Sequence, residues 1–270
     1  MIKKAIPIFL SLMLAASVIS PVCAEDSFDN ASDTLMPEVE GATALGTDGT
    51  AFGKGAEKWV LENAIAAMTS DADPEGTVYH DLRLRTKKVK RNSIKVVWQK
   101  VSGAKKYVIY ANKAGKKNTL KRVKTTTKTS YTLKKINGKN LKKGTYYKLM
   151  AAALDADDKV ITTSKIVFAA TKGGKAGNDK SVSVASKTKK KVNTVTLKVG
   201  KTYQLTVKTR KESGVQKVKR YRKIKYESSD TGIATVTAKG KIQAVKEGKC
   251  YAYAYAQNGL YSRVKVTVVK

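Results

Sequence analysis

The stretch that decides the fold is residues 226–248, which read YESSDTGIATVTAKGKIQAVKEG. Apolar and polar residues alternate over Ala234–Val236 and again over Ile242–Ala244, and a period of two is typical of strands with one buried face. Gly240 and Gly248 interrupt these runs at the places where turns are expected. The stretch therefore predicts strand, turn, strand, turn, strand, and it contains no cluster of catalytic side chains.

The same stretch resembles the bacterial immunoglobulin-like domain, group 2. The pattern of that family has an aromatic residue before Ser-Ser-Asp, then Ile-Ala-x-Val, then Gly-x-Ile-x-Ala, and then a Gly that opens the next strand. Tyr226 stands where the family usually has Trp. The resemblance implies a β-sandwich over residues 181–270. The Asn-Gly pair at 258–259 predicts a tight hairpin between its last two strands.

Residues 81–171 contain short alternating strands with turn signals between them, which is typical of another sandwich. The segment LKKGTYY at 141–147, together with Trp98 at the end of a strand, resembles the fibronectin type III domain. The resemblance implies that Tyr147 is the corner tyrosine, whose hydroxyl bonds back to the backbone, and that Trp98 packs in the core. We expect a fibronectin type III-like sandwich here.

The N-terminus has the three parts of an export signal. Two lysines near the start are followed by an apolar run over residues 5–19 and by Pro-Val-Cys-Ala at 21–24. The apolar run is too short to span a bilayer, which takes about 20 residues. Residues 1–24 are therefore predicted to be a signal peptide, so that the secreted protein begins at Glu25.

Residues 25–80 form an acidic leader with 12 acidic and 2 basic side chains, a net charge of −10. Residues 25–55 are polar and poor in large apolar groups, and we expect them to be disordered. Apolar residues recur at helical spacing farther along and predict a short helix over residues 56–70. This helix either packs on the first sandwich or lies free.

The rest of the chain is strongly basic. Residues 81–270 hold 50 basic and 9 acidic side chains, a net charge of +41, and only eight of the 54 basic residues in the whole chain are Arg. Lys is a hydrated point charge without the planar fork that gives Arg its bidentate contacts. The composition therefore favours diffuse attraction to polyanions over sequence-specific recognition.

A Gly-rich polar segment, residues 172–180, is predicted to be a linker that leaves the two sandwiches in limited contact. After signal cleavage Cys250 is the only cysteine, so no intramolecular disulfide can form and each sandwich depends on its apolar core. Cys250 shares a strand face with alanines and is expected to be buried. The single histidine, His80, is expected to be a solvated turn residue.

Two surfaces are candidate binding sites. The first has six cations within nine residues, and it is either a patch for a polyanion or solvated charge that keeps sheet edges from pairing. Its members are Lys217, Lys219, Arg220, Arg222, Lys223 and Lys225. The second is a row of tyrosines opposite Cys250, which either stack on sugar rings or pack across strands. Its members are Tyr251, Tyr253 and Tyr255.

No catalytic site, cofactor or metal is predicted. A lone histidine does not make a zinc site, and the glycines do not follow a strand as a phosphate-cradling loop does. The acidic group Asp155, Asp157 and Asp158 is interpreted as a solvated turn, with a calcium site as the less favoured alternative. These patterns predict a protein that is not an enzyme.

The function that the sequence favours is a secreted, cell-surface or cell-wall-associated binding or scaffolding protein. By resemblance, proteins that combine these two modules are exported by anaerobic Gram-positive bacteria, whose walls carry teichoic acids. We expect a monomer that is attached electrostatically to such anionic envelope polymers. Two alternatives remain open: a carbohydrate-binding, lectin-like adhesin module, and an extracellular protein that binds nucleic acid without sequence specificity.

Overall fold

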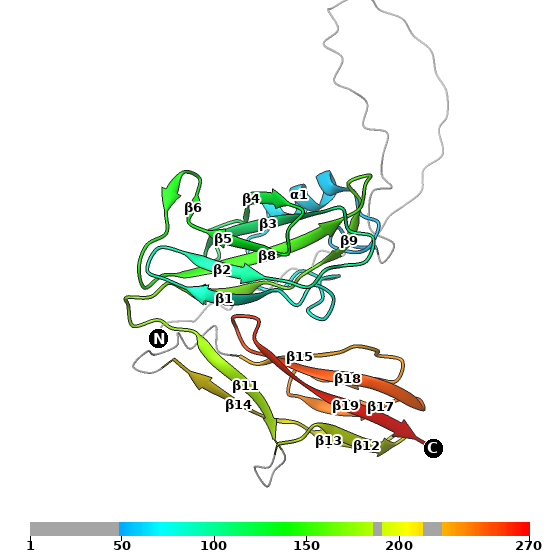
Figure 1. Cartoon of the computed structure of the whole chain (residues 1–270). Helices are drawn as coiled ribbons and strands as arrows, with labels where there is room; N and C mark the ends of the chain where they lie inside the picture. Colours follow the sequence, from blue (N-terminus) through cyan, green and yellow to red (C-terminus); the bar gives the residue numbers. More distant parts are fainter. Residues whose placement is uncertain (1–48, 186–190, 213–222) are drawn as a thin grey trace, which may run out of the picture. The chain divides into compact units, whose positions relative to one another are not determined.

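The computed structural model describes residues 49–185, 191–212 and 223–270. These residues form two β-sandwiches and one helix, α1, at Lys58–Ala67 (Figure 1). The predicted fold class, all-β with two immunoglobulin-like sandwiches, is therefore confirmed. The predicted signal peptide and residues 25–48 of the leader lie outside the described residues.

The first sandwich contains two antiparallel sheets and a small hairpin. One sheet has the order β1-β2-β5, with the bounds Arg85–Val89, Ile94–Val97 and Ser130–Leu133. The other has the order β10-β8-β3-β4, with the bounds Val167–Ala170, Tyr146–Leu154, Lys106–Lys113 and Lys121–Thr126, and β9 at Val160–Thr163 pairs with β8. The hairpin consists of β6 at Lys135–Ile136 and β7 at Lys139–Asn140.

The core between these two sheets contains the residues that the sequence placed there. Trp98 is buried and meets the ring of Tyr107 edge to face, with 5.6 Å between the centroids. The hydroxyl of Tyr147 accepts a hydrogen bond of 2.7 Å from the backbone N–H of Lys142. The predicted corner tyrosine is therefore confirmed by its own hydrogen bond.

A third layer covers the outer face of the larger sheet. All nine residues of β8 are buried, because its second face packs against α1 and the segment before it (Figure 1). Leu61 and Ile65 supply the buried side of the helix, and Phe52 is buried beside them. The predicted helix is present and packs on the first sandwich. The expectation of disorder is wrong for residues 49–55, since Phe52 belongs to this core.

Ion pairs join the acidic leader to the sheet. The Nζ of Lys148, on the covered face of β8, is fully buried and lies 2.8 Å from a carboxylate oxygen of Asp71. A buried ammonium group needs such a partner, because desolvation without one is costly. Weaker contacts join Glu62 to Arg122 at 3.4 Å. Opposite charges on one chain thus hold the described part of the leader against the sandwich.

The second sandwich is built from β11 to β19. Its four-stranded sheet has the order β12-β19-β18-β15, with the bounds Thr194–Lys198, Tyr261–Val269, Gly248–Tyr255 and Lys225–Ser228. Its three-stranded sheet has the order β13-β17-β16, with the bounds Thr202–Gln204, Lys241–Ala244 and Ala234–Val236. A separate pair is formed by β11 at Asp179–Ala185 and β14 at Thr206–Lys211. The pair β12 and β19 is parallel, and the others are antiparallel.

The stretch that decides the fold adopts the predicted strand and turn order. The ring of Tyr226 covers Gly240 so closely that a Cβ at this glycine would lie 2.6 Å from the ring. The carboxylate of Asp230 accepts the N–H of Gly232 at 2.9 Å and closes the turn before β16. The side chain at position 226 therefore requires a residue without Cβ at position 240.

The burial of Cys250 leads to a test of its thiol. Cys250 is buried in the second core, and burial raises the pKa of its thiol. In protein that begins at Glu25, a bulky maleimide at neutral pH is expected to leave native Cys250 unlabelled and to label it fully after denaturation. Thr231→Cys, at an exposed position, is the control and should react at once. Rapid labelling of native Cys250 would contradict its burial.

Candidate functional site

The two sandwiches contact each other directly, and we call this contact region the junction. The turn between β18 and β19 inserts its backbone into the first sandwich, where the N–H of Phe168 donates to the carbonyl of Gln257 at 2.6 Å. The N–H of Thr86 donates to the carbonyl of Asn258 at 3.0 Å. Within the described residues, the expectation of limited contact is therefore wrong, because the hairpin turn supplies backbone partners that its sequence does not reveal.

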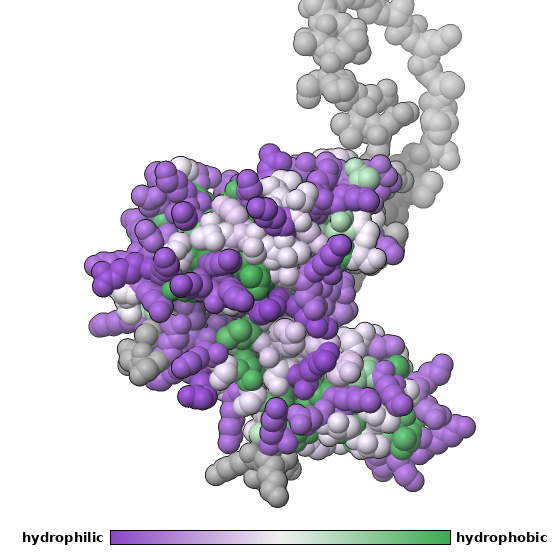
Figure 2. Space-filling model, in the orientation of Figure 1, coloured by the Kyte–Doolittle hydropathy of each residue, from purple (hydrophilic) through white to green (hydrophobic). Residues whose placement is uncertain are grey.

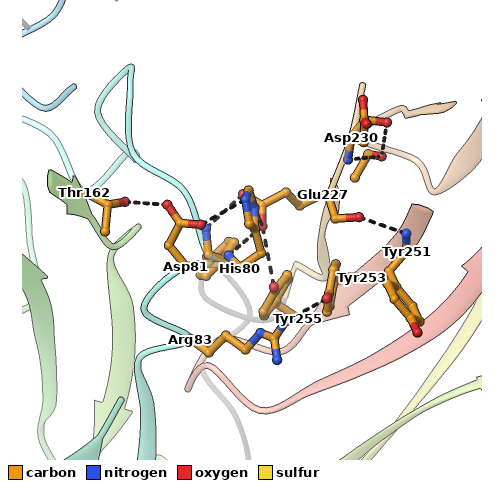
Figure 3. Close-up of polar contacts among 12 residues, drawn as sticks. His80, Asp81, Arg83, Thr162, Glu227, Asp230, Tyr251, Tyr253 and Tyr255 are labelled. Atoms are coloured by element: carbon orange, nitrogen blue, oxygen red, sulfur yellow. Dashed lines mark hydrogen bonds and ion pairs between the residues drawn. The ribbon is translucent and has the colours of Figure 1, made fainter. Parts of the chain in front are cut away.

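A carboxylate of the second sandwich holds the backbone of the first (Figure 3). The two oxygens of Glu227, on β15, accept the backbone N–H groups of Tyr79 and His80 at 2.8 Å each. The Nδ1 of His80 lies 3.0 Å from the same carboxylate, and its Nε2 lies 3.1 Å from Asp81. The side chain of Glu227 is only 11% exposed, so these contacts are little screened by solvent.

The two carboxylates change the protonation of the imidazole. Hydrogen bonds to Asp81 and Glu227 raise the pKa of His80 to about 10, against the opposing effect of burial. The same contact lowers the pKa of Asp81, which also accepts a hydrogen bond of 2.8 Å from Thr162. His80 is therefore a cation at neutral pH. The expectation of a solvated histidine is wrong, because β15 brings Glu227 against this turn.

Aromatic contacts surround this ion cluster. The ring of Tyr255 stacks on the ring of Tyr79, with 4.2 Å between the centroids and 19° between the planes. The guanidinium of Arg83 donates to the hydroxyl of Tyr253 at 2.8 Å and lies over the ring of Tyr261, 5.5 Å from its centroid. Rings from the second sandwich thus cover a segment of the first.

These contacts bury two of the three tyrosines in the predicted sugar platform. Tyr253 and Tyr255 are each 1% exposed, so the proposed sugar platform of Tyr251, Tyr253 and Tyr255 is contradicted for two of its three members. Alternation did place them opposite Cys250, but the face that they share is covered by the first sandwich. Tyr251 stays partly exposed and packs under Arg263, whose guanidinium lies 4.4 Å from the ring centroid.

His80, Asp81 and Glu227 form an ion cluster between the two sandwiches, which we call the ionic lock. A general base must be free to accept a proton, and His80 already holds its proton between two carboxylates at neutral pH. In the residues that the structure describes, no group of acidic, His and Cys side chains has the arrangement of a metal site. In the acidic turn, Asp158 pairs with Lys58 at 3.3 Å and with Lys106.

The predicted cationic patch is only partly described. Lys217, Lys219, Arg220 and Arg222 lie outside the described residues. Lys223 is exposed, whereas the Nζ of Lys225 pairs with the carboxylate of Asp73. Lys225 thus neutralises an acidic group of the leader, so its charge is not free for an external ligand.

Exposed cations extend well beyond that segment. Figure 2 shows hydrophilic residues over most of the visible face, with hydrophobic residues in small separate areas. Many exposed cations lie on strands of both sandwiches, including Lys95, Lys124, Lys198, Lys241 and Lys265. Several acidic residues are engaged in internal ion pairs, namely Glu57, Glu62, Asp71, Asp73, Asp81, Asp158 and Glu227. Internal pairing therefore leaves much of the positive surface charge unneutralised.

Three junction residues were missed by the sequence interpretation: Tyr79, Arg83 and Glu227. Glu227 had a usable signal, since it lies inside the decisive stretch and is one of only nine acidic residues among residues 81–270. An isolated acid in a basic domain is a candidate for an internal partner. Tyr79 and Arg83 had no comparable signal, because their contacts come from the other end of the chain.

Comparison with known proteins supports one domain directly. Residues 183–266 match the family model of the bacterial Ig-like domain, group 2, and this confirms the predicted resemblance. None of the curated proteins matches the chain. Among the described residues, no helix has the length and apolar character needed to cross a membrane.

Fibronectin type III domains occur among similar solved structures, as predicted. The FN5 domain of Drosophila Lar is 22% identical, covers 34% of this chain and 92% of its own, and has a TM-score of 0.27. A two-domain fibronectin type III segment of chicken tenascin is 14% identical over 67% of this chain and 94% of its own, with a TM-score of 0.26. The S-layer protein rSbsC(31–844) is 14% identical over 68% of this chain and 40% of its own, also at 0.26.

Proposed function

We propose that this chain is a secreted, non-enzymatic bacterial surface protein, which scaffolds or binds at the cell envelope and is attached electrostatically to anionic envelope polymers. The observation that carries the proposal is the excess of exposed cations on two sandwiches that hold 50 basic and only 9 acidic side chains. The match to a bacterial Ig-like domain supports a role at the surface.

The junction supports the scaffolding part of this proposal. Glu227 accepts the backbone N–H groups of Tyr79 and His80, and the ring of Tyr255 stacks on that of Tyr79. These contacts join the two sandwiches more closely than a flexible linker alone would. Charges on both sandwiches then act together on one polymer, which raises the effective concentration of the second contact.

The predicted cationic segment remains part of the proposal. Its members other than Lys225 form a short run that directly precedes β15 in the sequence, and a run of cations of this kind adds to the attraction for a polymer of phosphates. We assign the contribution to Lys217, Lys219, Arg220, Arg222 and Lys223. Lys225 is omitted because it pairs with Asp73.

Salt dependence tests the mechanism of attachment. Each phosphate that a lysine neutralises releases a counterion, so retention on isolated bacterial wall is expected to fall at least about tenfold between about 50 and 200 mM salt. Wall from which teichoic acid has been removed should retain much less protein than intact wall. Retention is measured by sedimentation with the protein that begins at Glu25.

Controls separate the alternatives. A neutral glycan matrix should retain little protein at any salt concentration, because it carries no charge that attracts lysines. Stacking on sugar rings would instead give retention that is insensitive to ionic strength. Retention on stripped wall that persists at high salt would contradict the proposal in favour of a lectin-like protein. Stronger binding to DNA than to intact wall at equal salt would contradict it in favour of a nucleic-acid-binding protein.

A further inference from the structure

Two neighbouring hollows run along the segment that joins the sandwiches. The first, of about 420 Å³, is lined by residues of the joining segment, including Lys172, Gly173, Gly174 and Lys180. The second, of about 340 Å³, is lined by Thr86, Lys87, Lys88 and residues around Asn258. Lys172, Lys180 and Glu212 line both, so the hollows form one groove.

Two β-bulges direct lysines into this groove. In β1 the register shifts between Thr86 and Lys88, so that Lys87 is the extra residue and both Lys87 and Lys88 line the second hollow. In a regular strand these neighbours would point to opposite faces. In β11 the register shifts between Asp179 and Ser181, so that Lys180 is the extra residue.

Backbone hydrogen bonds fix the remaining wall of the groove. The N–H of Lys172 donates to the carbonyl of Lys90 at 3.1 Å, and its carbonyl accepts the N–H of Gly144 at 3.1 Å. The amide of Asn178 makes two bonds of 2.8 Å to the backbone of Ala170. The positions of Lys172 and Lys180 are therefore set by the fold, so binding need not order the chain there.

The lysines of the groove, Lys87, Lys88, Lys172 and Lys180, are exposed and make no ion pair with a described residue. The acidic residues of the groove are Asp179 and Glu212, which the cations outnumber. Gly173 and Gly174 line the first hollow with backbone.

We propose that this groove is a specific binding site for a flexible, linear polymer of phosphate groups. The residues that bind it are Lys87, Lys88, Lys172 and Lys180. The inference rests on the proposed function and names the residues that bind the polymer. A diffuse cationic surface would not require two β-bulges that place lysines in the same groove. Lysine suits repeated phosphates as a point charge. The proposed occupant is a single flexible chain, which can follow two joined hollows.

The experiment compares two variants of equal charge. In the groove variant, Lys87, Lys88, Lys172 and Lys180 are each replaced by Gln. In the control variant, Gln replaces four exposed lysines that line neither hollow, Lys239, Lys241, Lys246 and Lys249. Binding of short linear inorganic polyphosphate is titrated over a range of salt, and thermal unfolding confirms that both variants fold.

The groove variant is expected to bind at least about tenfold more weakly than the control variant at the same salt. Its plot of log affinity against log salt should be shallower by about 3, since each lost phosphate contact of a single strand removes about 0.7 from the slope. The control variant should stay close to the unchanged protein.

The outcomes separate the groove from the proposed function. Equal weakening of both variants would overturn the groove and leave diffuse electrostatic attachment in place. Failure of the unchanged protein to bind polyphosphate at low salt would overturn both. Single-stranded DNA serves as the second probe, and groove-dependent binding of DNA in preference to polyphosphate would replace the proposed ligand by nucleic acid.

Discussion

Replacement of Gly259 by Ala is expected to lower the free energy of unfolding by about 3–5 kcal/mol. Gly259 has φ +79°, which strains any residue that carries a Cβ. An added methyl group would also overlap the carbonyl oxygen of Leu84 and lie 2.8 Å from the Cα of Arg85, both in the first sandwich. Because these contacts are backbone, they cannot move aside as a side chain can.

Gly200→Ala is the matched control. Gly200 has φ +78° in the same sandwich, but an added Cβ there meets no atom within 4 Å. It should therefore cost only the backbone strain, about 1–2 kcal/mol. The measurement is chemical denaturation of both variants and the unchanged protein. Equal losses for Gly259→Ala and Gly200→Ala would show that Gly259 does not lie against Leu84.

Replacement of Glu227 by Ala is expected to cost about 3 kcal/mol, because it leaves a half-buried imidazolium and two backbone N–H groups without their acceptor. The two N–H groups belong to Tyr79 and His80, and the imidazolium is that of His80. Glu247→Ala, at an exposed position without an ion pair to any described residue, should change the unfolding free energy by less than about 0.5 kcal/mol.

The pH dependence of this loss identifies its origin. The pKa of His80 is raised from 6.5 to about 10 in the folded protein, so the charged contribution is complete below pH 6.5 and is lost as the pH rises through about 10. The difference between the unchanged protein and Glu227→Ala should therefore shrink over that window. It should not vanish, since the backbone donors of Tyr79 and His80 do not titrate. A difference that stays constant from pH 6 to 10.5 would contradict the ionic lock.

Local sequence patterns were sufficient for the strands and for side chains that pack within one sandwich. Alternation over residues 226–248 identified the strands of the second domain, and the resemblance of the motif at 141–147 to fibronectin type III domains implied the hydrogen bond of Tyr147. Alternation also placed Cys250 and its neighbouring alanines in the core. These features depend on residues near one another in sequence, where periodicity and turn chemistry act directly.

One pattern in the sequence was informative but was not used. The strand β8 reads YYKLMAAAL, which is apolar on both faces except for Lys148. A strand of this kind needs cover on two sides. The second cover is the described part of the leader, and Asp71 supplies the partner for the buried Lys148.

The sequence by itself determined which residues share a strand face, because the side-chain period is two. Only the tertiary structure decided what covers each face. Tyr253 and Tyr255 point away from their own core, as alternation requires, yet they are buried because Tyr79 and Arg83 come from a distant part of the chain. Contacts between residues so far apart leave no periodic trace, so the junction could be seen only once both sandwiches were folded.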